Sequence, residues 1–281
     1  MPELNGLDFH VEIEGEGAPL LLLHGFTGSI RSWDGIRSNL AHDARLIAVD
    51  LIGHGQSASP ADASRYTLDW CTRDLAALLD HLGLQRANVL GYSMGGRAAL
   101  HFAVHAHSRV QTLILESASP GLEDPPERHR RLLSDEALAQ RILANGIDAF
   151  VAEWEAQPLL ALQQHVSAGV RQQQRELRLR NNPVGLANSL RGMGAGAQQP
   201  LWSRLSELSV PVHLIVGAAD TRYAAIAQRM AQLFQHARVS VVPDAGHTVH
   251  LDQPQAFALI VDAAREKTNR VTPADFPLST N

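Results

Sequence analysis

Short, uninterrupted apolar runs alternate along this chain with segments of helical periodicity. The runs PLLLLHG (19–25), RLIAVDLIG (45–53) and ANVLGYS (87–93) each reach a glycine at or near their end. Strands that are buried on both faces of a parallel sheet have this continuous apolar character, whereas half-exposed strands alternate apolar and polar residues. The sequence therefore predicts an α/β fold with a mostly parallel central sheet and helices on both faces.

The remaining segments fit the same architecture. Residues 8–13 alternate and predict a half-exposed strand. A further buried strand is predicted at 111–117, strands are predicted at 211–217 and 237–243, and helices at 29–41, 67–83, 94–107 and 253–266. The polar tail at 271–281 holds two prolines, and we expect it to be loosely ordered.

One segment interrupts this alternation. Three prolines break the pattern after Ser119, and residues 127–190 have helical character only, including the polar helix face RQQQRELRLR. The glycine-rich stretch RGMGAGAQQP follows, and it is no dinucleotide-binding motif because it does not lead from a strand into a helix. We expect residues 1–118 and 200–281 to form an α/β-hydrolase-like core and residues 119–199 to form a helical cap.

Composition excludes several classes of function. The net charge is −5, so no basic surface points to nucleic acid or to an anionic membrane. No apolar run has the length of a membrane helix, and the first residues lack the features of a signal peptide. Cys71 is the single cysteine, which excludes an intrachain disulfide and a multi-cysteine metal site. We expect a cytoplasmic protein with no membrane or nucleic-acid partner.

A nucleophilic serine is predicted at the end of the strand at 87–93. The residues GYSMG around Ser93 fit G-x-S-x-G, the sharp turn that presents such a serine between a strand and a helix. Asp220 follows the strand at 211–217, and His247 follows the strand at 237–243. The order Ser, Asp, His is that of α/β-hydrolases, and all three positions lie at carboxyl ends of parallel strands. Glu116, at another strand end, is an alternative acid.

An oxyanion hole and several structural residues are also predicted. The backbone amides of Met94 and Phe26 are the candidate donors to an anionic intermediate, and His24 and Gly25 shape the loop that carries Phe26. Other polar residues are predicted to have structural roles. Asp244 is predicted to lie in a turn, His54 in a loop, and His250 to have a structural role. We do not expect His101, His105 and His107 to bind a metal.

Arg97 has no evident place in a simple esterase. It lies four residues after Ser93, so both side chains share one helix face. An enzyme that cleaves neutral esters does not need a fixed cation one turn from its nucleophile. An anionic substrate group beside the nucleophile would explain this position.

The motifs HGFTG, DLIGHGQS, GYSMGG, GAAD and AGH together resemble the α/β-hydrolase superfamily over nearly the whole chain. The segments ESASPGL, AEWEAQPL and RLRNNPVGLANSLRGMGAGAQQPLW, with the arginines at 128–131, are similar to the 2-succinyl-6-hydroxy-2,4-cyclohexadiene-1-carboxylate synthase family of menaquinone biosynthesis. That resemblance implies a lyase that removes pyruvate from a cyclohexene bearing three carboxylates. Ser93, activated by Asp220 and His247, would abstract a ring proton, and the Phe26 and Met94 amides would hold the enolate.

The same resemblance implies a set of site residues. The positions that match the family's site are Tyr92, Ser93, Arg97, Arg131, Trp154, Arg178, Asp220 and His247. Around RLRNN the match is ambiguous, so Arg180 is an alternative to Arg178. Physical chemistry agrees with the arginines, because several carboxylates entering an acidic protein need cations that converge locally, and the guanidinium fork binds carboxylates bidentately. This chemistry needs no metal or organic cofactor.

Two other functions remain open at this stage. The same triad would serve a hydrolase of esters, or of carbon–carbon bonds in ring-cleavage products. A ligand-binding protein without activity is a third possibility, although such a protein has no need to keep all three residues of the triad. The protein is a monomer or a homo-oligomer.

Overall fold

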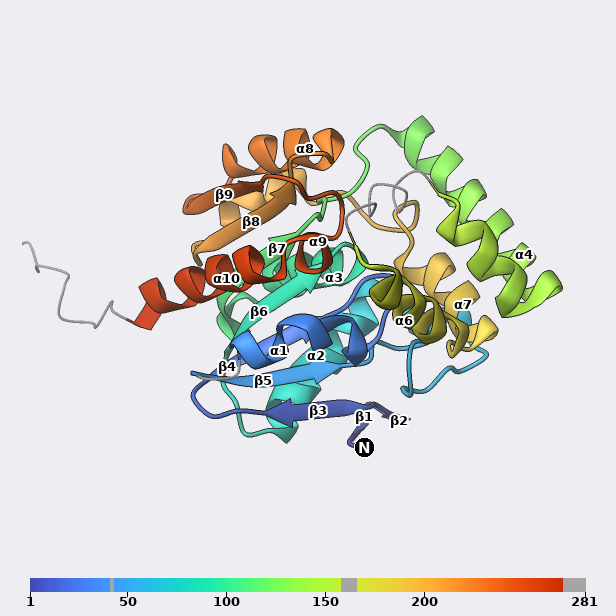
Figure 1. Cartoon of the computed structure of the whole chain (residues 1–281), viewed down its shortest axis with the longest axis horizontal. Helices are drawn as coiled ribbons and strands as arrows, with labels where there is room; N and C mark the ends of the chain where they lie inside the picture. The colour runs from blue at the N-terminus through green and yellow to red at the C-terminus, as the bar shows by residue number, and fades with distance from the viewer. Residues whose placement is uncertain (41–42, 158–165, 270–281) are drawn as a thin grey trace, which may run out of the picture.

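The computed structural model describes residues 1–40, 43–157 and 166–269. A seven-stranded sheet runs through its middle in the order β3-β5-β4-β6-β7-β8-β9 (Figure 1). All neighbouring strands pair in parallel except β3, which is antiparallel to β5. The strands are β3 (Val11–Glu14), β4 (Ala18–Leu23), β5 (Ala44–Val49), β6 (Ala87–Tyr92), β7 (Val110–Glu116), β8 (Val212–Gly217) and β9 (Ala237–Val242).

The predicted strand at 8–13 is divided in the structure. Its first residue belongs to β2 (Leu7–Asp8), which pairs with β1 (Glu3–Leu4) in a separate two-stranded ribbon. Its last residues belong to β3 at the edge of the main sheet. The other predicted strands agree with the observed ones to within a few residues at each end.

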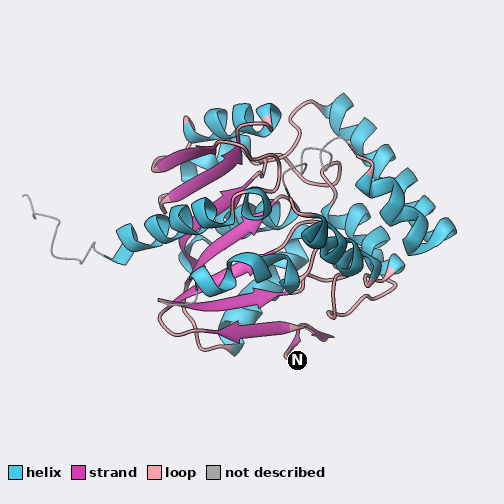
Figure 2. Ribbon diagram, viewed as in Figure 1, coloured by secondary structure: helices cyan, strands magenta, loops and turns pink. Residues whose placement is uncertain are grey.

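Helices cover both faces of the sheet, as Figure 2 shows. The helices of the core are α1 (Asp34–Leu40), α2 (Leu68–His81), α3 (Met94–His105), α8 (Thr221–Ala231), α9 (Val249–Asp252) and α10 (Pro254–Asn269). Short 3-10 turns are η1 (Ile30–Trp33), η2 (Ala63–Tyr66), η3 (His107–Arg109) and η4 (Trp202–Glu207).

The alternation of side chains along β4 explains this layering. Leu20 and Leu22 point to the face covered by α1 and α10, where they join a core that includes Phe257. Leu21 and Leu23 point to the opposite face and join the core beneath α2, α3 and α8. All four leucines are fully buried, and each stabilises the fold by roughly 1.5–3 kcal/mol relative to an exposed side chain.

Between β7 and β8 the described residues form helices and loops but no strand, as the sequence predicts. The α-helices are α4 (Pro125–Glu155), which is interrupted at Gly146, α6 (Ala168–Leu179) and α7 (Pro183–Met193), and they lie together at one end of the sheet (Figure 1). They share a small core that packs against Phe26. None of the residues of α6 is buried, in agreement with the polar character of RQQQRELRLR.

Among the described residues, no helix is long and apolar enough to cross a membrane. The polar tail at 271–281 lies outside the residues that the structure describes.

Candidate active site

Ser93 occupies a sharp turn between β6 and α3. Its backbone has φ 50° and ψ −107°, a conformation that costs a non-glycine residue about 1–3 kcal/mol. Two features hold this turn. The Ser93 amide donates to the carbonyl of Glu116 on β7 (2.8 Å), and Gly95 packs so closely that a Cβ atom would overlap with the Leu23 carbonyl. The predicted nucleophile turn is therefore present, and its strain is held by neighbouring strands.

The three residues of the predicted triad form one hydrogen-bonded chain. His247 Nδ1 lies 2.7 Å from Asp220 Oδ2, and His247 Nε2 lies 3.0 Å from Ser93 Oγ. A carboxylate can only accept hydrogen bonds, so His247 Nδ1 carries the proton and Nε2 is free to accept the serine proton. His247 and Asp220 are 2% and 5% exposed, which shields this chain from water. The arrangement has the geometry in which a histidine activates a serine hydroxyl.

Glu116, the alternative acid, contacts a different histidine. Its carboxylate lies 2.7 Å from His250 Nδ1, whereas Asp220 is the acid that contacts His247. Glu116 and His250 are both buried, and this second pair lies beside the first. The predicted assignment of Asp220 thus agrees with the geometry.

The loop that follows β4 carries Phe26 and is fixed by His24. The Leu51 amide donates to His24 Nε2 (3.0 Å), so Nδ1 is protonated and donates to the Gly25 carbonyl (2.8 Å). Burial lowers the pKa of His24, which keeps its imidazole neutral, as this pattern requires. His24 and Gly25 therefore shape the loop as the sequence predicts.

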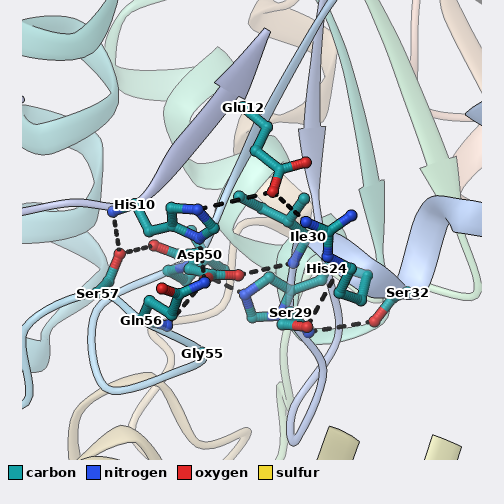
Figure 3. A network of polar contacts seen from close by, with 12 residues as sticks. His10, Glu12, His24, Ser29, Ile30, Ser32, Asp50, Gly55, Gln56 and Ser57 are labelled. Carbon is teal, nitrogen blue, oxygen red and sulfur yellow. Dashed lines mark hydrogen bonds and ion pairs between the residues drawn. The ribbon is translucent and has the colours of Figure 1, made fainter. Parts of the chain in front are cut away.

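Asp50 connects this loop to two other segments, as the close view in Figure 3 shows. Its buried carboxylate accepts hydrogen bonds from the Ile30 amide (2.7 Å), the Gln56 amide (2.8 Å) and His10 Nδ1 (2.8 Å). Ser57 completes the network by donating to the Asp50 carbonyl (2.6 Å). Because a buried carboxylate is costly without such partners, the network fixes the loops at 24–30 and 51–57 relative to each other.

A single asparagine joins the helical segment to both loops. The Asn181 side chain donates to the Thr27 carbonyl (2.9 Å) and accepts from the Gly55 amide (3.1 Å). Asn181 is buried and lies between α6 and α7. The backbone beside Phe26 is therefore held from the core and from the helical segment.

A cavity of about 170 Å³ opens above Ser93. Every predicted site residue except Asp220, which lies behind His247, lines this cavity: Phe26, Tyr92, Ser93, Met94, Arg97, Arg131, Trp154, Arg178 and His247. The structure thus brings residues from β6, α3, α4 and α6 to the same space. The convergence of arginines that the sequence analysis requires is present.

Arg97 is held without a carboxylate. Its Nη1 donates to the Met193 carbonyl (2.6 Å) and, more weakly, toward Gln198 Oε1 (3.4 Å). In the part of the chain that the structure describes, no carboxylate lies within ion-pair distance of Arg97. Burial, together with repulsion from Arg131, lowers the pKa of Arg97 to about 10, and the side chain is still a cation at neutral pH.

The two other arginines of the cavity are paired. Arg131, whose side chain is 45% exposed, donates to Asp135 (2.7 Å), and Arg178 donates to Glu155 (2.9 Å). Arg180, the alternative to Arg178, is exposed at the end of α6 and does not line the cavity. Of the two alternatives, Arg178 is therefore the one that lies at the cavity.

Tyr92 lies between the two histidines. Its ring centroid is 5.6 Å from that of His247 and 4.9 Å from that of His250, and its hydroxyl bonds with Thr248 Oγ1 (2.8 Å). Burial, reinforced by the nearby Glu116, raises the pKa of Tyr92, so its hydroxyl stays protonated. Tyr92 therefore offers the cavity a neutral aromatic wall.

Sequence reasoning missed several cavity residues. Gln174 lies one turn before Arg178 on α6, and that spacing places both on one helix face. The glycine-rich stretch supplies Met193, Gly194 and Ala195, and the Met193 carbonyl is the one that Arg97 contacts. The remaining lining residues are Gly25, Thr27, Gly28, Ser32, Leu138, Ser189, Leu190, Tyr223, Thr248, His250 and Leu251. The spacing of Gln174 is the one signal that the sequence offers for these positions.

No cluster of three or more metal-binding side chains occurs within residues 1–40, 43–157 and 166–269. His101, which is buried, and His105, which is exposed, stack on one another at 4.0 Å between ring centroids, and neither lines the cavity.

Comparison with known proteins agrees with this geometry. A family model described as the alpha/beta hydrolase fold matches residues 18–254. The structure of MenH from S. aureus superposes with a TM-score of 0.88 at 31% identity, covering 93% of this chain and 98% of that one. A thermophilic esterase from Thermogutta terrifontis, solved with malate bound, superposes with a TM-score of 0.79 at 26% identity, covering 93% and 94%.

Two curated relatives narrow the assignment. A Bacillus subtilis (strain 168) protein, provisionally named a 2-succinyl-6-hydroxy-2,4-cyclohexadiene-1-carboxylate synthase, is 45% identical over 92% of this chain and 94% of its own length. The Serratia proteamaculans (strain 568) protein of that name is 35% identical over 85% and 89%. This chain therefore belongs to the α/β-hydrolase fold family and, within it, to the family of the 2-succinyl-6-hydroxy-2,4-cyclohexadiene-1-carboxylate synthases.

Proposed function

We propose that this protein is a lyase of menaquinone biosynthesis that eliminates pyruvate from 2-succinyl-5-enolpyruvyl-6-hydroxy-3-cyclohexene-1-carboxylate. The relatives in the preceding section carry the name of the product of this reaction. The observation that carries the proposal is the position of Arg97, a half-buried cation without a carboxylate partner, one helical turn from Ser93.

The charges of the cavity fit a substrate with three carboxylates. Arg97 and Arg131 lie close enough to repel one another and form one cationic pole, while Arg178 lies near Tyr92 and forms another. Carboxylates that leave water need such partners, because an unpaired buried charge is costly. We assign the substrate carboxylates to these arginines, and Trp154 with Tyr92 to the apolar faces of the ring.

The triad supplies the base. His247 takes the proton of Ser93 Oγ, and Asp220 stabilises the imidazolium that forms. The serine oxygen then removes the ring proton next to the succinyl carbonyl. The electron pair of that C–H bond forms an enolate with the succinyl carbonyl. When this enolate collapses, a C2=C3 double bond forms, the C3=C4 double bond shifts to C4=C5, and the C5–O bond to the enolpyruvyl group breaks. The leaving enolate of pyruvate takes up the proton that His247 holds and becomes pyruvate, which restores the triad.

The enolate that develops at the succinyl carbonyl needs hydrogen-bond donors. Met94 is the first residue of α3, where an amide has no acceptor within the helix, and the Phe26 amide lies in the loop that His24 and Asp50 fix. We assign the stabilisation of the enolate oxygen to these two amides. The loss of one donor of this kind typically lowers kcat by about 10²–10³-fold.

The test is a direct assay of pyruvate release from the enolpyruvyl substrate. The purified protein is expected to release pyruvate, and Ser93→Ala is expected to lose at least about 10³-fold in kcat while keeping its fold. Wild-type protein that turns over short p-nitrophenyl esters rapidly but releases no pyruvate would overturn the lyase assignment.

Hydrolysis is the second candidate. The favouring observation is the likeness to the Thermogutta esterase, together with a Ser93–His247–Asp220 chain that would serve acyl transfer equally well. The two candidates differ in their need for Arg97. An esterase acting on neutral esters would keep its activity in Arg97→Ala, whereas the lyase would not.

A further inference from the structure

Glu116 contacts both chain segments that meet in the active site. It is the last residue of β7 and is fully buried. Its backbone carbonyl accepts the amide proton of Ser93 (2.8 Å). Its carboxylate accepts two hydrogen bonds from His250, one from the backbone amide (3.0 Å) and one from Nδ1 (2.7 Å).

His250 lies three residues after His247, on the same short segment. Its ring is packed among Trp33, Tyr92 and Phe257, with centroid separations of 4.8, 4.9 and 5.8 Å. A ring enclosed in this way moves only together with the backbone that carries it. The Glu116 carboxylate therefore fixes the segment that presents His247.

We propose that Glu116 is a positioning residue that sets the separation between Ser93 Oγ and His247 Nε2. Its main chain holds the serine, and its side chain holds the segment of the histidine. Glu116 does not line the cavity, so it acts through these two residues and not on the substrate. The inference rests on the catalytic role of the triad in the proposed function, but not on the identity of the substrate.

Glu116→Gln isolates the role of the carboxylate. The substitution preserves the size of the side chain and the carbonyl that binds Ser93. The glutamine oxygen can accept from one His250 N–H, but its amide group cannot accept a second one. We expect His250 and the attached segment to shift, and displacement of a catalytic group by about 1 Å can lower a rate by about 10²-fold. In the assay of pyruvate release, kcat should fall by about 10²-fold while KM changes by less than about threefold, because the arginines of the cavity are untouched.

The decisive readout is the rate at which a fluorophosphonate labels Ser93, followed by mass spectrometry. This rate reports activation of the serine by His247 and needs no knowledge of the natural substrate. Glu116→Gln is expected to be labelled about 10²-fold more slowly than the wild type, with an unchanged circular dichroism spectrum.

Asp74→Asn is the matched control. Asp74 is another buried carboxylate, held by two hydrogen bonds from Arg65 (2.7 and 2.8 Å), and it does not line the active-site cavity. This variant loses a buried ion pair, so its stability should fall, but it should be labelled at the wild-type rate. Equal slowing of both variants would mean that Glu116 matters only for stability, and would overturn the proposal.

A second pair of variants keeps the test decisive if Glu116→Gln does not fold. His250→Gln retains a side-chain N–H donor for Glu116, whereas His250→Leu has none. We expect His250→Gln to be labelled within about tenfold of the wild-type rate and His250→Leu to be slower by a further factor of about ten. Equal labelling rates for these two variants would overturn the proposed role of Glu116. Labelling of Glu116→Gln at the wild-type rate would overturn it as well.

The labelling assay also separates this inference from the proposed function. If the wild type releases no pyruvate but the labelling rates follow the expected order, the lyase assignment fails and the role of Glu116 stands. If the wild type releases pyruvate and Glu116→Gln is labelled at the wild-type rate, the lyase assignment stands and the role of Glu116 fails.

Discussion

Arg97 donates to the carbonyl oxygen of Met193 at 2.6 Å, which joins the helix after the nucleophile turn to the last residue of α7. The acceptor is a neutral carbonyl, so the contact fixes the guanidinium without cancelling its charge. The Gln198 side chain contributes in the same neutral way. The arginine is therefore held in place and remains available to an anionic ligand.

Removal of this cation should impair substrate binding in the transition state. We expect Arg97→Ala to lower kcat/KM, with a loss of transition-state stabilisation of about 2–5 kcal/mol. This is the typical cost of leaving a buried charge, here a substrate carboxylate, without its partner. Arg97→Lys should recover little, because an ammonium group cannot reproduce the bidentate fork. Steady-state kinetics of pyruvate release provide the measurement, and the melting temperature provides the control. A variant that loses thermal stability but keeps its kcat/KM would show that Arg97 is structural.

Arg178 and Arg175 form a matched pair on α6. Both side chains contact Glu155, but only Arg178 lines the cavity. We expect Arg178→Ala to raise KM by at least about tenfold through the loss of a carboxylate partner, and Arg175→Ala to leave KM within about twofold of the wild type. Initial rates over a range of substrate concentrations check this. Equal effects of the two substitutions would point to the contact with Glu155, and not to substrate binding.

The stability of the fold should decrease in acid because of two buried histidines. Burial lowers the pKa of His54 to about 3, and it also lowers the pKa of His24. In the unfolded chain both titrate near their ordinary value of 6.5. Below that pH the unfolded state binds more protons than the folded state. The contribution of these histidines to the free energy of unfolding is therefore complete above pH 6.5 and is lost as the pH drops toward their folded-state pKa values. The loss is up to about 1.4 kcal/mol per pH unit for each histidine.

Urea denaturation between pH 6.5 and 5 checks this prediction in the wild type and in His54→Gln. The variant lacks one titrating group, so its free energy of unfolding should depend less steeply on pH, even if it is lower at pH 7. If the free energy of unfolding depended equally steeply on pH in the two proteins, His54 would not be one of the groups responsible.

The nucleophile turn should not tolerate a side chain at Gly95. A Cβ atom there would overlap with the carbonyl groups of Leu23, the last residue of β4, and of His24, which follows it. We expect Gly95→Ala to destabilise the fold by more than about 3 kcal/mol, because the backbone of β4 has to move. Gly35→Ala is the control, since a Cβ atom at that helical position contacts nothing within 4 Å and should be neutral or stabilise by up to about 1 kcal/mol. Thermal denaturation of the two variants compares them directly.

The triad could be predicted from the sequence because its residues lie at the carboxyl ends of parallel strands. Ser93, Asp220 and His247 come after β6, β8 and β9, and parallel strands bring such positions to one edge of the sheet. Local pattern could not decide between Asp220 and Glu116, since both follow strands. The choice depends on which carboxylate approaches His247 in space, and the structure gives that distance.

The cationic lining of the cavity was harder to predict. Arg131 and Arg178 lie on helices whose orientation no local periodicity fixes, and only the resemblance to a family indicated them. Gln174 was missed although it shares a helix face with Arg178. The Asp50 network was missed because two of its three donors, at Ile30 and Gln56, are backbone amides. Every residue except proline has a backbone amide, so the sequence does not indicate which of them donates to Asp50.

Asn181 has a consequence for the construction of hybrid enzymes. Its side chain bonds to the backbone of Thr27 and of Gly55, on two different loops of the sheet-bearing part of the chain. Transplanting residues 119–199 onto the scaffold of an unrelated esterase would transfer Arg131 and Arg178 but not these receiving loops. A chimera that is to gain a new substrate therefore needs the loops at 24–30 and 51–57 exchanged together with the helices.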